Sequence, residues 1–598
     1  MKAIHWVWAA VLAAGVSLPA AAQGPEKVLR YAFPIAETGF DPAQVHDLYS
    51  RVITANIFET LYDYDYLARP AKVKPVLAEA LPQVSADFRT WTIRLKRGVY
   101  FADDPAFGGK KREVTAQDVV YSFKRIYDPK TRSPHISALE EEKIIGLDEL
   151  REKAEKTGKF DYVNDIEGMK ALDRYTVQFK LAVTRPRFVQ TIADPGILGV
   201  VAREVIDKYG DEIMAHPVGT GPFKLAEWKR SSRITLVKNP NFRDEFFDDQ
   251  PRAGDKSAEA VAARLKGKKL PMLDKVVVSI INEPQPRWLS FLNAEQDFME
   301  RLPATFVNQA IPNNKLAPNL QKKGIQMERV QLSDITMWYF NMEDPVVGGY
   351  TPEKVALRRA LGLAYNTEME VRLPRRGQAI IAQDILGPNT TSWDPNFRSE
   401  MGKYDRARAI ALLDMFGYTD KNGDGWRDMP DGKPLVLEMN TQGTADQREL
   451  DEILKKHMDA VGVKMEFKIG IWPEQLKAAR AGKLQMWQLG FSAAEPDSGV
   501  GLQIGASAQA GQQNLARFSN KQYDEIFAKQ GVMPDGPERD AQIRDAVRII
   551  VAYMPYKIRV SRIGTDLWQP WVMGYKRHPF SNSFWRYIDI DTTKLPAH

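Results

Sequence analysis

The chain of 598 residues contains no cysteine. Disulfide bonds, thiolate metal ligands, cysteine nucleophiles and a lipid anchor on an N-terminal cysteine are therefore excluded. Histidine is scarce too: the seven residues are scattered, with no HExxH motif and no pair at metal-ligand spacing. No GxSxG or SxxK serine motif stands out either. These absences argue against an enzyme and against a metal centre.

The chain also lacks an apolar run that is long enough to cross a bilayer. The run from Trp6 to Val16 covers 11 residues, whereas roughly 18 to 20 are needed. It follows Lys2 and precedes Pro19 and the small residues Ala20–Ala22, which is the layout of a cleavable secretory signal. We therefore expect a signal peptide at residues 1–22 and a soluble periplasmic protein that is not a lipoprotein.

The charge balance is nearly even, with 83 Lys and Arg against 77 Asp and Glu, or a formal net charge of +6. So small a surplus gives no reason to expect a nucleic acid as partner. Strand patterns such as Val276–Ile281, Leu435–Met439 and Val463–Ile469 alternate with amphipathic helical patterns. The sequence therefore predicts an α/β protein with mixed sheets.

The stretch HPVGTGPFKLAEWKRSSRITLVKNPNF, residues 216–242, contains a glycine turn that looks like a phosphate-binding loop. Such a loop needs consecutive backbone N–H donors and a Lys-Ser/Thr pair or a third glycine. Pro222 removes one donor, and Lys224 stands where a dinucleotide fingerprint has glycine. The alternating and β-branched residues that follow predict two strands, so we expect a tight turn that leads into a hairpin.

The same stretch resembles the signature of the family 5 solute-binding proteins, the oligopeptide- and dipeptide-binding receptors of ABC importers. Other segments resemble landmarks of that family and together cover nearly the whole chain after the expected signal peptide. They are WTIRLKRGVYF (91–101), VTAQDVVYSFKRI (114–126), IEGMKALDRYTVQFKL (166–181), LNAEQDF (292–298), WYFNMEDPVVGGYTPEKVALRRALGLAYN (338–366) and YDRARAIALLDMFGY (404–418).

The resemblance implies a two-lobed periplasmic-binding-protein fold (type II, cluster C) with mixed sheets and an extra inserted domain. Lobe I is expected from residues 23–61, 181–282 and 553–598, with an accessory domain, 62–180, inserted in it. Lobe II is expected at 283–552. The resemblance also implies a monomeric receptor without cofactor, which closes on a small solute by a hinge motion and delivers it to the permease subunits of an ABC importer.

Two walls of a ligand pocket are implied by the resemblance. The first is the loop after the first strand, Glu37-Thr38-Gly39-Phe40-Asp41-Pro42, although Asp-Pro is equally typical of a simple turn. The second is MWQLGFSAAEPDSG, residues 486–499, which resembles the family's Gly-Trp-x-x-Asp segment. In that family the aromatic residue lines the pocket, and the Asp pairs with the free α-amine of a bound peptide.

The second wall departs from the family pattern at one position. Gly490 and Phe491 match, but Ala494 stands where the family has its Asp, and a methyl group cannot compensate an ammonium taken out of water. Either Glu495 or Asp497 takes over the amine, or the ligand has no amine at that point.

Several ligand classes and functions remain open on the sequence alone. A peptide or peptide-like solute is the first hypothesis. A non-peptide ligand such as haem, an opine-like conjugate or an oligosaccharide is the second, since 13 Trp residues and 10% aromatic content permit a stacking pocket. A periplasmic chaperone that uses an open cleft, or an unrecognised exported hydrolase, would belong to another class.

The segment DKNGDGWRDMPD, residues 420–431, has the ligand spacing of an EF-hand calcium loop. A strand is expected after it instead of a helix, and the last position is Asp431, whose side chain is shorter than the usual Glu. We therefore favour an Asx-turn hairpin over calcium. The calcium candidates are Asp420, Asn422, Asp424 and Asp428.

Three further segments carry expectations that a structure can test. Glu140–Lys159 is charge-dense and predicts a solvated helix, and Arg243–Lys269 predicts an exposed loop. Residues 404–418 predict an amphipathic helix with a core-facing side. The apolar positions assigned to that side are Ala407, Ile410, Ala411, Leu413 and Met415.

Overall fold

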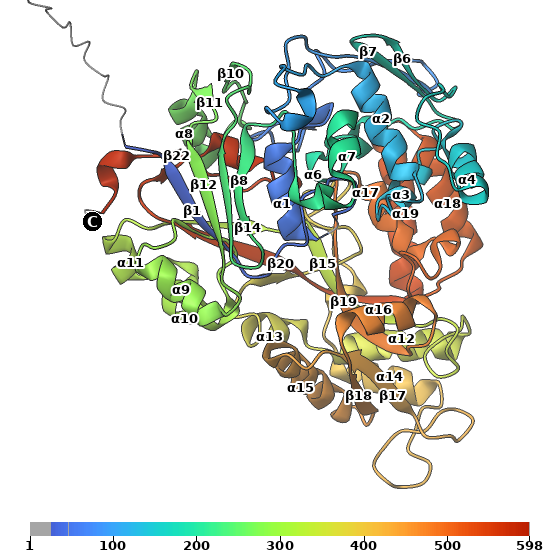
Figure 1. Cartoon of the computed structure of the whole chain (residues 1–598). Coiled ribbons are helices and arrows are strands. Elements are labelled where there is room, and N and C mark those ends of the chain that lie inside the picture. Colours follow the sequence, from blue (N-terminus) through green and yellow to red (C-terminus); the bar gives the residue numbers. More distant parts are fainter. Residues whose placement is uncertain (1–24, 46, 597–598) are drawn as a thin grey trace, which may run out of the picture.

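The computed structural model describes residues 25–45 and 47–596. The expected signal peptide, residues 1–22, lies outside the described residues. Within the described part, no helix is both long and apolar enough to cross a membrane. The described chain forms two lobes (Figure 1). We call the part around the two four-stranded sheets lobe I and the part around the eight-stranded sheet lobe II.

The first sheet of lobe I has the order β1-β12-β9-β8. β1 (Val28–Phe33) runs parallel to β12 (Lys275–Ile280), which pairs antiparallel with β9 (Arg233–Lys238). β9 and β8 (Phe223–Lys229) form the predicted hairpin. The side chains of α1 (Leu48–Ile57) join the hydrophobic core of this sheet. The other helices of this part include α7 (Arg203–Tyr209) and α8 (Lys256–Leu265).

The second sheet of lobe I has the order β4-β5-β7-β6 and is covered by α2 (Ala116–Tyr127). α2 begins at a capping box in which Thr115 and Asp118 exchange hydrogen bonds. The buried core here reaches beyond 62–180 and takes in side chains as far as Val218. The elements are β4 (Gln83–Val84), β5 (Thr90–Arg94), β6 (Met169–Asp173), β7 (Thr176–Lys180), α3 (Ile136–Glu140), α4 (Leu147–Thr157) and α5 (Phe188–Thr191).

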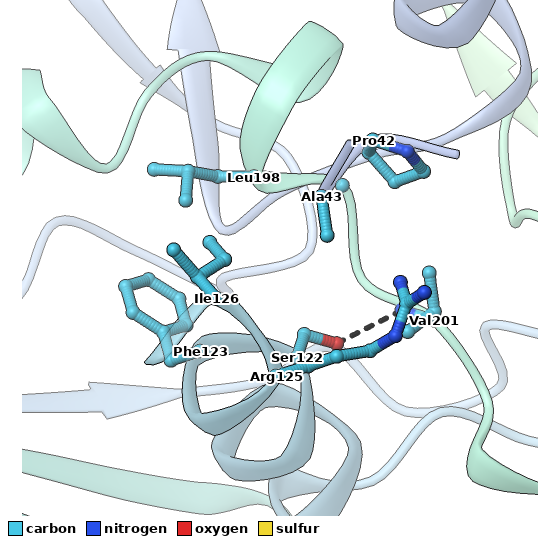
Figure 2. Close-up of a pocket in the computed structure, with 9 residues that line it drawn as sticks. Pro42, Ala43, Ser122, Phe123, Arg125, Ile126, Leu198 and Val201 are labelled. Atoms are coloured by element: carbon cyan, nitrogen blue, oxygen red, sulfur yellow. Dashed lines mark hydrogen bonds between the residues drawn. The ribbon is translucent and has the colours of Figure 1, made fainter. Parts of the chain in front are cut away.

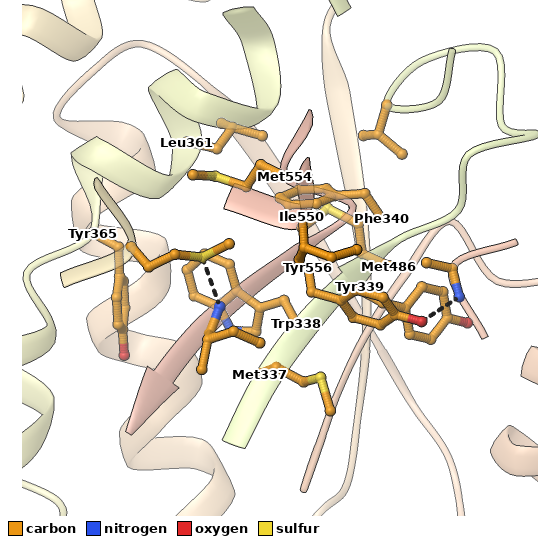
Figure 3. Packing of buried hydrophobic residues seen from close by; sticks show 14 of the residues in the cluster. Met337, Trp338, Tyr339, Phe340, Leu361, Tyr365, Met486, Ile550, Met554 and Tyr556 are labelled. Atoms are coloured by element: carbon orange, nitrogen blue, oxygen red, sulfur yellow. Dashed lines mark hydrogen bonds between the residues drawn. The ribbon is translucent and has the colours of Figure 1, made fainter. Parts of the chain in front are cut away.

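Lobe II surrounds the eight-stranded sheet, whose main path is β13-β20-β15-β19-β17-β18. β15 (Asp334–Phe340) is buried along its whole length, and Figure 3 shows its Trp338 and Tyr339 packed with Tyr556 and with Leu361 of α12 (Pro352–Ala364). The other elements are α13 (Thr367–Arg372), β16 (Ala379–Ile381), α14 (Arg406–Met415), β17 (Val436–Thr441), α15 (Ala445–Asp459), β18 (Lys464–Ile469), α16 (Trp472–Arg480), β19 (Met486–Ser492), α17 (Ser498–Gly501), α18 (Lys521–Val532) and α19 (Pro537–Tyr553).

The strand β20 (Tyr556–Trp568) connects the lobes. Its first half pairs with β15 and β16 in lobe II, and its second half pairs with β14 (Gln326–Gln331) and β13 (Phe298–Met299). Phe298 belongs to the core of the first sheet of lobe I. The chain crosses a second time between β14 and β15, directly beside β20. Two neighbouring strand crossings of this kind are suited to a hinge.

The glycine turn at 219–222 is a packing turn. The N–H of Gly221 donates to the carbonyl of Ile57 at 2.8 Å, and a Cβ added at Gly219 would lie 2.1 Å from that same oxygen. The Thr220 hydroxyl donates to Glu59 at 3.0 Å. Glycine is needed here because two backbones touch, and the turn leads into β8 as predicted.

Two expectations about surface segments were wrong. In α14 the buried residues are Ala409 and Leu413, whereas Ala407, Ala411 and Met415 are exposed. Of the five assigned positions, Leu413 is buried and Ile410 packs against the lobe II core, so the predicted stripe was right at two positions and wrong at three. The segment 243–269 is not a plain loop, because it contains α8, and Arg243 forms a buried ion pair with Glu59 at 2.7 Å.

Candidate functional site

The two lobes are in direct contact at Arg187, which precedes α5 of lobe I. Its guanidinium reaches across to lobe II, where it pairs with Asp497 at 3.2 Å and with Asp535 at 3.2 Å. It also donates to the carbonyl of Gly531 in the last turn of α18 and to that of Met533 directly after this helix, each at 2.8 Å. The side chain is only 10% exposed. Figure 1 shows α18 and α19 beside α3 and α4.

A second contact between the lobes is formed by Glu141, which directly follows α3. The amide of Gln503 donates to its carboxylate at 2.9 Å, and the amide of Gln509 donates at 3.2 Å. Both amides belong to the short helical turns after α17 in lobe II. These hydrogen bonds and the Arg187 contacts hold the lobes together, so the structure is a closed form.

The segment after β19 supplies the lobe II side of this junction. Phe491, near the end of β19, is half-buried and packs against the lobe II core. Asp497 caps α17 by accepting from the N–H of Gly499, and its carboxylate also binds Arg539 at 2.6 Å. Because Arg187 and Arg539 both bind Asp497, this carboxylate is already neutralised within the protein.

Glu495 lies in the same segment and is half-buried. Within the part of the chain that the structure describes, its carboxylate has no hydrogen bond or ion pair. Burial raises the pKa of its carboxyl to about 8, and the nearby charges of Asp497 and Glu142 raise it further while Arg187 opposes them. The neighbouring Ala494 is exposed. The lobe junction therefore contains one acidic group whose charged form lacks a partner.

Two polar atoms of lobe I close to Glu495 also lack a partner within the described residues. The Tyr64 hydroxyl is buried and unbonded, and its pKa is raised by burial and then by the charge of Glu495. Glu142 accepts from Thr191 through one carboxylate oxygen at 2.8 Å, while its Oε2 is buried and unbonded. Each unsatisfied buried polar group in a folded protein calls for an explanation, such as a bound water, an ion or a functional role.

The N-terminal loop, the first predicted wall, uses its polar atoms for the fold. Glu37 is buried and accepts from Trp228 at 2.6 Å and from the N–H of Ser231 at 3.0 Å. Thr38 is exposed and donates to Asp47 at 2.6 Å. Phe40 is fully buried against Trp228.

Gly39 has no room for a side chain, since an added Cβ would lie 2.5 Å from Met214 Cε. Asp41, next in the loop, forms a buried bidentate pair with Arg125, with two contacts of 2.6 Å. Its backbone carbonyl also accepts from the N–H groups of Gln44 and Val45, as in a turn. The neighbouring cavity, lined by Pro42, Ala43 and α2 residues, measures 10 Å³ (Figure 2). It has room for about one water molecule, so it is not a solute site.

A larger cavity of 240 Å³ lies beside β20, and all of its lining residues come from β20 or from residues 301–450. Three arginines line it. Arg562 pairs with Asp334 at 2.7 Å and Arg375 with Glu370 at 3.0 Å, whereas Arg301 lies 3.7 Å from Glu300 and its side chain is 43% exposed. The remaining lining residues are Leu302, Ala304, Leu332, Pro374, Gln378, Asp446, Leu450, Ile563, Gly564 and Thr565.

The loop at 420–431 binds its own backbone. Asp420 accepts from the N–H groups of Gly423 and Gly425, Asn422 from that of Asp424, and Asp424 from that of Trp426. Asp428 accepts from the N–H of Lys421. Among the described residues, no three acidic or histidine side chains are grouped closely enough to hold a metal ion. The loop has the geometry of Asx turns.

The family described as bacterial extracellular solute-binding proteins, family 5 Middle, matches residues 72–513. The chain belongs to this family. It is similar to the di/tripeptide-binding protein 2 of Pseudomonas aeruginosa, with 25% identity over 96% of each chain. It is also similar to the heme-binding protein A of Haemophilus influenzae, with 24% identity over 93% of this chain and 91% of the relative.

A solved structure similar to this one is the periplasmic binding protein DppA from Helicobacter pylori in complex with the peptide STSA. The TM-score is 0.71 at 22% identity, covering 94% of this chain and 98% of that one. This likeness confirms the predicted two-lobed periplasmic-binding-protein fold. The matched relatives are binding proteins, in agreement with the expectation of a solute receptor.

Sequence reasoning missed the lobe I side of the junction. Glu141 and Glu142 fall in the segment that was interpreted as a solvated helix, and α4 within it is indeed largely exposed. Arg187 and Tyr64 have no motif around them. Consecutive acidic residues at the end of a short helix were the only available pattern, and such patterns are common on solvated surfaces.

Proposed function

We propose that this protein is the periplasmic receptor of an ABC importer and that it captures a short peptide between its lobes, with the peptide's α-ammonium on Glu495. The observation that carries the proposal is the unpaired carboxylate of Glu495 at the closed junction. An ammonium group would give it the charge-assisted hydrogen bond that the protein itself does not supply. The family's usual Asp is replaced by Ala494, so the anchor has moved by one residue.

Closure would then depend on the ligand's charge. Closing brings Glu141 and Glu142 of lobe I near Glu495 of lobe II, and like charges that approach in a poorly solvated site repel. A cation between them removes this penalty only in the closed form. Ligand binding would therefore shift the population toward the closed form, the form that a permease distinguishes from the open one.

The 240 Å³ cavity is suited to the other end of such a peptide. Ser492 of β19 lies opposite Asp334 of β15, and Asp334 pairs with Arg562 on β20, which lines the cavity. Two strand spacings separate β19 from β20, or about 10 Å. Arg301, the least paired arginine of the cavity, would bind the carboxylate.

The matched relatives support a peptide, since di/tripeptides and dipeptides appear in the names of several of them. They also support partnership with ABC permease subunits, because the family consists of extracellular solute-binding proteins. Haem remains the second candidate, since a heme-binding protein covers almost the same length of the chain. No reaction is part of this proposal, because capture and release need none.

Calorimetric titration with a tripeptide of free termini tests the proposal, with the N-acetylated and C-amidated forms as comparisons. Acetylation should abolish binding, and amidation should weaken it. Arg301→Ala should weaken binding of the free acid while leaving the amide unaffected, and Arg548→Ala on the exposed side of α19 is the matched control. Equal binding of the free and acetylated peptides would contradict the amine anchor.

A double variant tests the displaced anchor directly. Glu495→Gln should lose affinity for the free-amine peptide, and adding Ala494→Asp should restore part of it, since a carboxylate would then occupy the position used in the family. Native mass spectrometry of the protein purified from periplasm identifies the natural ligand. A single non-peptide adduct such as haem would overturn the peptide assignment, and suppression of client aggregation without ligand binding would favour a chaperone.

A further inference from the structure

The charges at the lobe junction do not balance, and the imbalance remains after every internal ion pair is counted. Asp497 and Asp535 share Arg187 and Arg539. Asp194 has its own partner in Arg51. The first set has two carboxylates and two guanidiniums, and the second set has one of each. These groups are therefore balanced and leave the junction no net charge that could attract a ligand.

Three carboxylates remain: Glu141 and Glu142 from lobe I, and Glu495 from lobe II. Glu141 is held by the neutral amides of Gln503 and Gln509, and Glu142 by the hydroxyl of Thr191. None of these donors carries charge. Burial raises the pKa of all three carboxyls, that of Glu495 to about 8, so their charged forms are disfavoured unless a cation compensates them.

The cations available to these three carboxylates are few. Arg185 lies close enough to lower the pKa of Glu141 and Glu142 against the effect of burial, and it donates to the carbonyl of Glu141. Lys143 also acts on Glu141, but its side chain is 49% exposed and pairs with Asp148 at 3.4 Å. With one half-buried guanidinium, that of Arg185, against three carboxyls, the fully ionised junction would lack two compensating positive charges.

A second observation concerns two buried polar atoms beside these carboxyls. Tyr64 is 6% exposed and Glu142 is 9% exposed, yet the Tyr64 hydroxyl and Glu142 Oε2 have no partner within the described residues. The charges that act most on the Tyr64 hydroxyl are those of Glu495 and Asp194, so it lies within the same acidic group. Two unbonded polar atoms beside an unpaired carboxylate provide acceptors for more than one donor group.

We infer that the ligand carries two cationic groups at this end, an α-ammonium on Glu495 and a basic side chain on its first residue directed at Glu142 and Tyr64. This inference rests on the proposed function and narrows it to peptides with an N-terminal lysine, arginine or a similar basic residue. A single ammonium would pair with Glu495 and leave the buried Glu142 carboxyl without a cation, so the charged form of Glu142 would stay costly.

The test compares two peptides by calorimetric titration, Lys-Ala-Ala and norleucine-Ala-Ala. Norleucine keeps the aliphatic stem of lysine and lacks only its ammonium. The lysine peptide should bind at least about tenfold more tightly, the effect of one buried charge-assisted hydrogen bond. Equal affinities, or tighter binding of the norleucine peptide, would overturn the inference.

Glu142→Gln provides the residue-level test. This change should reduce the preference for the lysine peptide over the norleucine peptide to less than about threefold, which is the usual variation of such contributions between sites. The affinity for the norleucine peptide should stay the same. Glu140→Gln, two residues earlier and half-buried, is the matched control and should keep the full preference. If the control removes the preference as well, the effect is not specific to Glu142 and the assignment of that residue fails. If Glu142→Gln does not fold, the comparison of peptides on the unmodified protein still decides.

Failure of this inference can be distinguished from failure of the proposed function. If both peptides bind equally, the receptor assignment stands and only the second cation is refuted. If neither peptide binds to the folded protein, the peptide assignment fails. Titration with 1,5-diaminopentane tests whether the site takes two cationic groups from a ligand that is not a peptide. Binding of this diamine without binding of either peptide would support a site for two cations and refute the peptide assignment.

Discussion

The two predicted walls of the pocket differ in how their polar atoms are used. In the N-terminal loop, Glu37 binds Trp228 and Ser231, and Asp41 binds Arg125, both within lobe I. In the segment after β19, Asp497 is paired in the same way, but Glu495 has no partner. A buried acid with partners stabilises the fold, whereas the charged form of a poorly solvated acid without partners costs free energy that protonation or a cation can recover.

The largest expected effect concerns the wall that we assign to the fold. Asp41→Ala leaves Arg125, which is 4% exposed, as a buried cation without a partner, and should lower the free energy of unfolding by about 3–5 kcal/mol. Chemical denaturation measures this. Glu227→Ala, which removes an exposed pair with Arg233, is the control and should leave stability unchanged. A stable Asp41→Ala protein with impaired ligand binding would place Asp41 in the site instead.

Glu495→Gln should have the opposite effects to Asp41→Ala, with a loss of ligand affinity and no loss of stability. Affinity for a free-amine peptide should fall about 10- to 100-fold, since one charge-assisted hydrogen bond is lost. Stability should not fall, because the neutral amide removes a charge that the fold does not pair. Calorimetry and thermal unfolding on the same sample measure both effects. Glu525→Gln on the exposed side of α18 is the control, and a large loss of stability in Glu495→Gln would assign Glu495 to the fold.

Arg187→Ala tests whether the contact between the lobes is coupled to binding. The variant loses the contacts with Asp535 and with the turn between α18 and α19, while Asp497 keeps Arg539. The closed population should fall, and affinity with it, by about tenfold. Small-angle scattering should show a larger radius of gyration at low ligand concentration and a return to the compact form at saturation. An unchanged radius would mean that Arg187 does not govern closure.

The pH dependence of ligand-free closure follows from the same carboxyl. Closure raises the pKa of Glu495 from its ordinary value of 4.5 to about 8, so the closed form binds a proton that the open form releases. Closed protein should therefore be favoured below pH 4.5 and lose this advantage as pH rises through about 8. Scattering across this range measures it. Glu495→Gln should remove most of the dependence, and an unchanged profile would contradict the assignment.

The smallest expected effect concerns the loop at 420–431. Because its carboxylates accept from their own backbone N–H groups, calcium at about 5 mM, above the dissociation constants of extracellular sites, should not change the melting temperature. A clear rise in the melting temperature, reversed by a chelator, would show that the loop rearranges to bind calcium.

Local pattern was enough to predict much of the fold. The strand alternation in 223–238 gave the β8–β9 hairpin, and Thr351 followed by Pro352 marked the start of α12. Helix type was also predicted correctly for 404–418, but the buried side was predicted only in part, because small alanines carry little information about which face meets the core. The extension of the second core of lobe I to Val218 depends on long-range packing that no local pattern records.

The sequence by itself determined the family resemblance, the turn chemistry around residues 219–222, and the absence of the usual Asp at Ala494, since each depends on residues that are neighbours in the chain. Only the tertiary structure shows which of two neighbouring acids is paired within the described residues. Glu495 and Asp497 are equivalent candidates by spacing, and they differ because Arg187 and Arg539 come from distant segments to neutralise one of them. Glu142 and Tyr64 likewise reach the site only through folding, because closure brings together groups that are hundreds of residues apart.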